Sequence, residues 1–194
     1  MKFVSGVVIT LVVLLAAFLI FIYSGWYDVS AMNEESRMMK WIFNTTKNNS
    51  VESRIENISV PELNDSSMIK EGFEHYNEMC VSCHSAPGKE EPELSKGLNP
   101  PAPYLVDEAK ETDARELFWV TKNGIRMTGM PAWGKTHTDE QIWNIVAFMK
   151  KLPDMSAEDY EKMENENEMM DDNHNHNGEK EEHKHSHSDE DHHH

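Results

Sequence analysis

The longest run of hydrophobic positions lies at the amino terminus. Residues 3–23 are almost entirely apolar and carry no charge, and a run of this length is enough for one helix to cross a bilayer. Lys2 and the terminal amine precede the run and Asp28 follows it, an arrangement that keeps the amino terminus in the cytoplasm. We therefore predict a membrane anchor over residues 1–27. The protein would be single-pass in the cytoplasmic membrane, with everything after the anchor on the periplasmic, extracytoplasmic side.

A cleaved signal peptide is the alternative for the same segment. Its apolar region would normally be shorter, and no small-x-small cleavage sequence follows the run. Trp26 and Tyr27 instead provide the aromatic side chains that are typical of a membrane interface. The pattern favours an uncleaved anchor.

Residues 28–64 are polar, rich in Asn and Ser, and predict an extracytoplasmic linker. One stretch, around residues 34–43, has a helical pattern and is too apolar for a free linker. Its apolar members are Met38, Met39, Trp41, Ile42 and Phe43. These side chains could rest on the membrane interface, on the chain's own folded domain or on a partner, and the chain's own domain is the default expectation.

Residues 65–153 predict an all-α domain of short helices. We expect a first helix over residues 67–80, a second from Asp113 to about Gly124 and a third from Thr138 to Pro153. The second and third begin with a capping-box pattern, in which Glu116 or Gln141 stands three residues after the cap.

Residues 154–194 differ from the rest of the chain in charge. They contain 15 acidic residues and three lysines, so they account for −12 of the chain's net charge of −17. With few apolar residues, this segment predicts a disordered acidic tail. It also holds eight of the eleven histidines: His174, His176, His183, His185, His187, His192, His193 and His194. Divalent metal ions are therefore possible partners, although a solvated tail without a metal function is the alternative. No nucleic-acid partner is expected.

The most specific chemical motif is Cys-Val-Ser-Cys-His at residues 80–84. Cys-x-x-Cys-His is the attachment sequence of a c-type haem, whose vinyl groups form thioethers with the two thiols. The histidine is then placed to bind iron from one face of the ring. A redox-active cysteine pair and half of a zinc site are the alternatives. Cys80 and Cys83 are the only cysteines, so a haem that takes both leaves no disulfide.

A candidate for the sixth iron ligand lies further along the chain. Met130 stands between Gly129 and Pro131 in a segment too rich in glycine to be helical, where the backbone can approach a ring closely. Met127 is the nearest competitor, and Met149 lies on a helix face that we expect to be packed.

Several segments together resemble a class I c-type cytochrome, in particular the membrane-anchored monohaem cytochromes of bacterial respiratory chains. They are residues 76–88, 97–103, 116–120 and 129–134. The resemblance covers about residues 25–153. It implies that Cys80 and Cys83 hold one covalent haem c, that His84 is the proximal ligand and that Met130 is the distal one.

The same resemblance implies two structural roles. A carbonyl group of the proline-rich loop at residues 100–103 would accept the proton of the outer ring nitrogen of His84. The first and last helices of the domain would cross closely, with a small residue at the contact and aromatic side chains around it. Gly72, Phe73, Tyr76 and Trp143 match that arrangement by residue type.

Taken together, these features predict an electron carrier and not an enzyme. Histidine and methionine ligation leaves no open position for a substrate, and membrane redox complexes (an oxidase, reductase or dehydrogenase) would be the partners. Two alternatives stay open. One is a haem-based catalytic or gas-sensing protein with a labile sixth ligand, and the other is a fixed cytochrome subunit of an oxidase or dehydrogenase.

Overall fold

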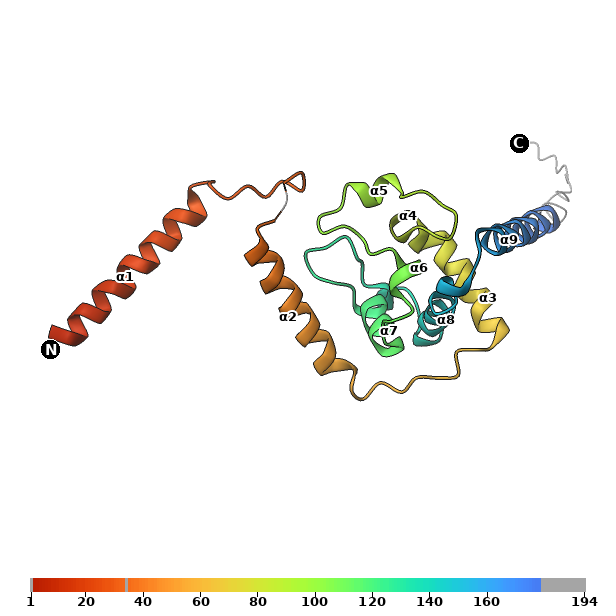
Figure 1. Cartoon of the computed structure of the whole chain (residues 1–194), viewed down its shortest axis with the longest axis horizontal. Coiled ribbons are helices and arrows are strands. Elements are labelled where there is room, and N and C mark those ends of the chain that lie inside the picture. Colours follow the sequence, from red (N-terminus) through yellow and green to blue (C-terminus); the bar gives the residue numbers. More distant parts are fainter. Residues whose placement is uncertain (1, 34, 179–194) are drawn as a thin grey trace, which may run out of the picture. The chain divides into compact units, whose positions relative to one another are not determined.

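The computed structural model describes the backbone of residues 2–33 and 35–178, and all regular elements in these ranges are helices (Figure 1). This confirms the predicted all-α class. The longer helices are α1 (Lys2–Tyr23), α2 (Arg37–Ile55), α3 (Ser66–His75), α7 (Ala114–Asn123), α8 (Asp139–Met149) and α9 (Ala157–Gly178). The shorter ones are a π-helical turn (Tyr76–Cys80), α4 (Val81–His84), α5 (Glu93–Lys96), α6 (Leu105–Glu108) and two 3₁₀ turns (Trp133–Lys135 and Leu152–Asp154). The chain divides into two units, residues 1–45 and 46–194.

The first unit contains α1, which has the properties expected of an anchor. Its segment Phe3–Tyr23 has 21 residues and a mean hydropathy of 2.9, and its apolar side chains are exposed. A soluble helix would bury such a surface, whereas a bilayer can cover all of it. A signal sequence would share this length and composition, so α1 fits membrane anchoring without excluding cleavage.

Helix α2 is longer than the sequence predicted. We expected a short helix near residues 34–43, but α2 begins at Arg37 and continues to Ile55. Its second half is rich in Asn, Ser and Thr, which have low helix propensity and hide the helix from a local pattern. Val51 is buried there, and burial of one face outweighs such propensities.

The core of the second unit forms where α3 crosses α8. Gly72 stands at the crossing, because a Cβ atom there would collide with the backbone oxygen of Asn144. Phe148 of α8 packs edge-to-face against Phe73, with ring centroids 5.4 Å apart, and lies 5.2 Å from Tyr76. The close crossing at a small residue therefore exists as expected.

One residue of that expectation was wrong. Trp143 does not join these aromatic side chains but stacks on Phe118 of α7, with ring centroids 4.2 Å apart. Phe148 takes the expected place instead. It lies on the face of α8 that points to α3, whereas Trp143 lies five residues earlier, on the face that meets α7.

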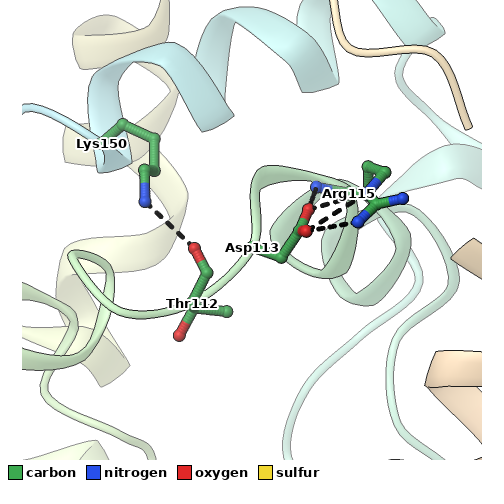
Figure 2. A network of polar contacts seen from close by, with 4 residues as sticks. All are labelled: Thr112, Asp113, Arg115 and Lys150. Atoms are coloured by element: carbon green, nitrogen blue, oxygen red, sulfur yellow. Dashed lines mark hydrogen bonds and ion pairs between the residues drawn. The ribbon is translucent and has the colours of Figure 1, made fainter.

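The predicted helix starts are present, with one difference. Thr138 and Gln141 form a complete capping box at α8. At α7, the Asp113 side chain caps the helix by accepting a hydrogen bond from the Arg115 amide, and it pairs with the Arg115 guanidinium, in place of the expected capping box with Glu116 (Figure 2). These bonds, the hydrogen bonds from Arg115 above all, lower the pKa of Asp113 to about 2.

Lys150 fastens the segment before α7 to the end of α8. Its ammonium group donates to the carbonyl oxygens of Ala109 (2.7 Å), Thr112 (3.0 Å) and Lys110 (3.1 Å), and the bond to Thr112 is drawn in Figure 2. One ammonium group thus satisfies three carbonyl groups of the segment between α6 and α7.

The packed domain does not end at residue 153. The Tyr160 side chain is fully buried, its ring lies 5.4 Å from that of Phe73, and its hydroxyl donates to the Asn77 side chain at 2.8 Å. Met155 and Met163 pack on the same core, and Lys89 pairs with Glu164 at 2.7 Å.

The prediction of disorder from residue 154 was therefore wrong for the start of this segment. A few well-spaced apolar residues are enough to attach an acidic helix, and net composition conceals them. Ile58 and Leu63 also contact the core, so the domain begins before residue 65. Residues 179–194, which include His183 and the histidines after it, lie outside the described residues, and metal binding by the tail stays a prediction.

Candidate haem site

The motif Cys80–His84 lies at the end of a continuous helical path. Helix α3 passes into the π-helical turn Tyr76–Cys80 and then into α4, Val81–His84. A π-helical turn holds one residue more than an α-helical turn, so it shifts the direction of the side chains that follow. Cys80 is buried, Cys83 and His84 are half-buried, and both thiols are free. Burial raises the pKa of the Cys80 thiol to about 12.

The imidazole of His84 is held by a single backbone contact. Its Nδ1 lies 2.8 Å from the carbonyl oxygen of Pro103, and because a carbonyl can only accept, Nδ1 must carry the proton. The lone pair of Nε2 is then available to a metal. Burial also lowers the pKa of His84, which favours the neutral ring.

The loop that supplies this carbonyl is the one that we expected. The sequence left open which of its proline residues accepts the proton, and the structure assigns Pro103. Proline can occupy this position because it provides a carbonyl and needs no partner for an amide proton.

Ser85 ends α4 and was not predicted to matter. Its φ of 57° is unusual for a residue with a side chain. Three hydrogen bonds hold it there. The Tyr76 hydroxyl donates to the Ser85 carbonyl at 2.8 Å, and the Ser85 hydroxyl donates to the carbonyls of Lys89 and Glu90. A serine directly after the motif gives no sequence signal for this role, because the φ angle depends on the fold.

The segment around Met130 is ordered by short-range bonds. Gly124 begins it with a φ of 65°. The amide of Ile125 donates to the carbonyl of Met130 at 3.2 Å, and the amide of Met130 donates to the Thr128 hydroxyl at 3.1 Å. Met130 is half-buried, whereas the side chain of Met127 is 81% exposed.

The Met130 loop and the loop that holds His84 meet each other. A Cβ atom at Gly129 would lie 2.6 Å from Cδ2 of Leu98, so glycine lets this leucine side chain approach the Met130 loop closely, and a larger residue would require the leucine to shift. Leu98 stands two residues before the proline-rich loop, residues 100–103, that supplies the Pro103 carbonyl. The segments that carry the imidazole and the thioether are thus joined by one packing contact.

Comparison with known protein families covers the segment that carries these residues. The family model described as cytochrome C oxidase, cbb3-type, subunit III matches residues 67–149. This segment is a class I c-type cytochrome domain. No curated protein sequence matches the chain. The matched residues run from the start of α3 to the end of α8. They contain all four candidate haem-binding residues, Cys80, Cys83, His84 and Met130.

A class I cytochrome domain implies haem binding and haem-based electron transfer, and the donor set of this one fits the group. The thiols of Cys80 and Cys83 are free and stand three residues apart, and the imidazole of His84 follows them with a fixed tautomer. The half-buried thioether of Met130 lies in the loop that meets Leu98, just before the proline-rich loop.

The zinc alternative needs a cluster of further ligands around the cysteines. Within residues 3–33 and 35–169, no group of three or more His, Cys, Asp or Glu side chains is arranged to hold a metal ion. Met149 is buried in the core, as expected, and is no ligand candidate.

Proposed function

We propose that this protein is a membrane-anchored carrier of single electrons with one covalent haem c. Cys80 and Cys83 would hold the haem through two thioethers, Nε2 of His84 would bind iron on one side and the sulfur of Met130 on the other. Bound haem iron supplies the redox chemistry by changing between Fe(II) and Fe(III). The observation that carries the proposal is the 2.8 Å contact from Nδ1 of His84 to Pro103, which leaves the other ring nitrogen of the motif histidine free for a metal.

The chain's own residues favour a carrier over a catalyst or a gas sensor. If His84 and Met130 both bound the iron, one nitrogen and one sulfur donor would leave no position for a substrate, oxygen or nitric oxide. The contact with Pro103 fixes the orientation of the imidazole and makes Nε2 a better donor to iron.

We further propose that α1 keeps the haem domain at the outer surface of the cytoplasmic membrane. Its length and exposed apolar surface support a membrane helix, and the lack of a small-x-small cleavage sequence after it favours an uncleaved anchor. Electrons would then pass between redox complexes of the same membrane. The excess of acidic residues in the chain would favour basic docking surfaces, with a preference that weakens as salt is added.

A fixed cytochrome subunit is the second candidate. The description of the matching family, which names a subunit of an oxidase, favours it. Purification in mild detergent separates the two candidates. A free carrier elutes alone at the mass of one chain or a small oligomer, and a fixed subunit elutes in constant ratio with other membrane chains.

The axial ligands are tested by absorption spectra of the oxidised protein. The wild type should show the weak far-red band of methionine-sulfur ligation, and Met130→Ala should lose it and admit cyanide or carbon monoxide. Met127→Ala is the matched control, because its exposed side chain should contribute nothing. If Met127→Ala removed the band and Met130→Ala kept it, the assignment would be wrong.

Covalent attachment is tested separately. Haem should stay with the polypeptide through acid-organic extraction of the wild type. Release of all the haem by that extraction would contradict the thioethers of Cys80 and Cys83.

A further inference from the structure

The first half of α2 exposes large apolar side chains. The exposed fractions are 66% for Met38, 67% for Trp41, 39% for Ile42 and 45% for Phe43. Single exposed apolar residues are ordinary, but four within six positions of one helix form a patch, and such patches mark contacts with another phase or molecule. We call Met38, Met39, Trp41, Ile42 and Phe43 the α2 patch.

The same half-helix also carries basic and polar residues, and these are separated from the apolar ones. Met38, Trp41 and Ile42 are spaced i, i+3 and i+4, which places them on one side of the helix. Arg37, Lys40, Asn44 and Lys47 follow the same period and come to lie on the opposite side. The segment is therefore amphipathic, with a basic polar face.

Its charge sets this segment apart from the rest of the protein. Residues 37–47 contain three basic residues and no acidic one, in a chain whose net charge is −17. A helix with Trp and Phe on one face and Lys and Arg on the other matches a lipid surface. The apolar face can enter the boundary between head groups and acyl chains, and each basic residue near an anionic surface adds electrostatic attraction.

The connection to α1 brings the same surface within reach. Residues 24–36 join the end of α1 to the start of α2, and they span at most about 45 Å even if fully extended. The connection is shortened by a turn, in which Asp28 accepts hydrogen bonds from the Ser30 amide and the Asn33 side chain. Trp26 and Tyr27, both exposed, follow α1 directly and suit the interface between lipid and water.

We infer that residues 37–47 form an interfacial helix on the membrane that α1 crosses. The α2 patch would enter the head-group region, and Arg37, Lys40 and Lys47 would face anionic phosphate groups. This inference rests on the proposed anchor. The protein would then be attached to one bilayer twice, by α1 and by residues 37–47. Only the attachment through residues 37–47 would depend on lipid charge.

The test uses the full-length holoprotein in lipid vesicles. Cys80 and Cys83 would be consumed by the haem, so one introduced cysteine can be labelled with a fluorophore. Ile42→Cys reports the apolar face of α2, Asn44→Cys the polar face two residues away, and Leu14→Cys the middle of α1. Quenching by doxyl-labelled lipid measures contact with the bilayer, and quenching by a neutral water-soluble nitroxide measures contact with water.

In vesicles that contain phosphatidylglycerol, lipid quenching at position 42 should exceed that at position 44 several-fold, and water-phase quenching should show the reverse. In vesicles of phosphatidylcholine alone, this contrast should shrink. A contrast independent of lipid charge would overturn the role assigned to the basic face.

Position 14 separates failure of the inference from failure of the proposed function. If position 14 is quenched by lipid but positions 42 and 44 behave alike, α2 does not lie on the membrane and the inference is wrong. If position 42 is shielded from both quenchers, protein and not lipid covers the α2 patch, which also overturns it. If position 14 itself is not quenched by lipid, the anchor and with it the proposed function fail.

Discussion

The two sides of the candidate haem site are built in different ways. His84 follows directly from a helix that is part of the core, with Gly72, Phe73 and Tyr76 buried against α8. Met130 lies in a loop that is held by backbone bonds within a few residues and by glycine at two close approaches. The His84 side is therefore stabilised by long-range burial, and the Met130 side by local geometry.

This difference indicates how each side should respond to change. Damage to the core beneath His84 costs folding free energy, because the buried aromatic side chains belong to the whole domain. Damage to the Met130 loop should cost little folding free energy but should displace a ligand. The following changes test that separation.

The largest effect is expected from loss of Tyr160. Its ring is fully buried against Phe73 and its hydroxyl bonds to Asn77, so Tyr160→Ala should lower the free energy of unfolding by about 3–5 kcal/mol. Truncation after residue 154 removes the same contacts and should have a similar effect. Denaturant unfolding followed by haem absorbance and circular dichroism measures both.

Truncation after residue 178 is the matched control for this prediction. It removes part of the acidic segment but keeps Tyr160 and Met163, and it should leave the unfolding midpoint almost unchanged. Equal stability of the two truncated proteins would show that α9 does not support the core.

The next largest effect is expected at the helix crossing. In Gly72→Ala, the new methyl group would meet the backbone of Asn144, which cannot move without parting α3 from α8. Such overpacking should cost about 3 kcal/mol or more. Gly97→Ala is the control, since its Cβ would lie 3.6 Å from the nearest atom, an ordinary contact. The thermal midpoint of Gly97→Ala should match the wild type, whereas a normal midpoint for Gly72→Ala would contradict the crossing.

A smaller effect is expected at the end of α4. Tyr76→Phe removes the donor for the Ser85 carbonyl and leaves a buried acceptor unpaired, at a cost of about 1–3 kcal/mol. In Tyr104→Phe the lost contact is a long one, 3.5 Å to the carbonyl of Ala86, and the stability should change less. Both variants should keep the far-red band, because neither touches the Met130 loop.

The smallest effect on stability, with the clearest effect on ligation, is expected at Gly124. Its φ is 65°, and a Cβ there would lie 2.8 Å from the Met130 carbonyl oxygen. Gly124→Ala should displace the Met130 loop at a cost of about 1 kcal/mol while weakening the far-red band and raising the affinity for cyanide. A band of full strength in this variant would show that the loop does not control the ligand.

The sequence predicted those parts of the molecule whose signals are local. The Cys-x-x-Cys-His motif and the capping box at Thr138 each depend on residues a few positions apart, whereas the close crossing at Gly72 was expected only from the resemblance to class I cytochromes. The proline-rich loop was expected to hold His84, but selecting Pro103 needed the three-dimensional path of the loop. Phe148 was overlooked in favour of Trp143 because both are large aromatic residues on one helix, and only packing decides which faces α3.

Other parts depended on information that composition hides. The average composition of residues 154–194 is strongly acidic, and it hid the contribution of Tyr160. One buried tyrosine is nevertheless enough to attach the start of α9 to the core. The second half of α2 was missed for a similar reason, since its Asn and Ser residues conceal a helix with Val51 on its buried side.

The burial of Tyr160 also bears on the order in which the protein is made. In the proposed topology the amino terminus stays in the cytoplasm and the segment after α1 is exported, so residues 80–84 reach the outer side of the membrane before Tyr160 does. Until then Phe73 and Phe148 lack the ring that covers them, and we expect the motif cysteines to stay accessible to the attachment machinery. Stalled chains that end before and after residue 160 would reveal this as a difference in the rate of haem attachment. Because Tyr160 would be exported after the motif, the core around Phe73 would stay incomplete while haem is attached. Packing of Tyr160 would then complete the core.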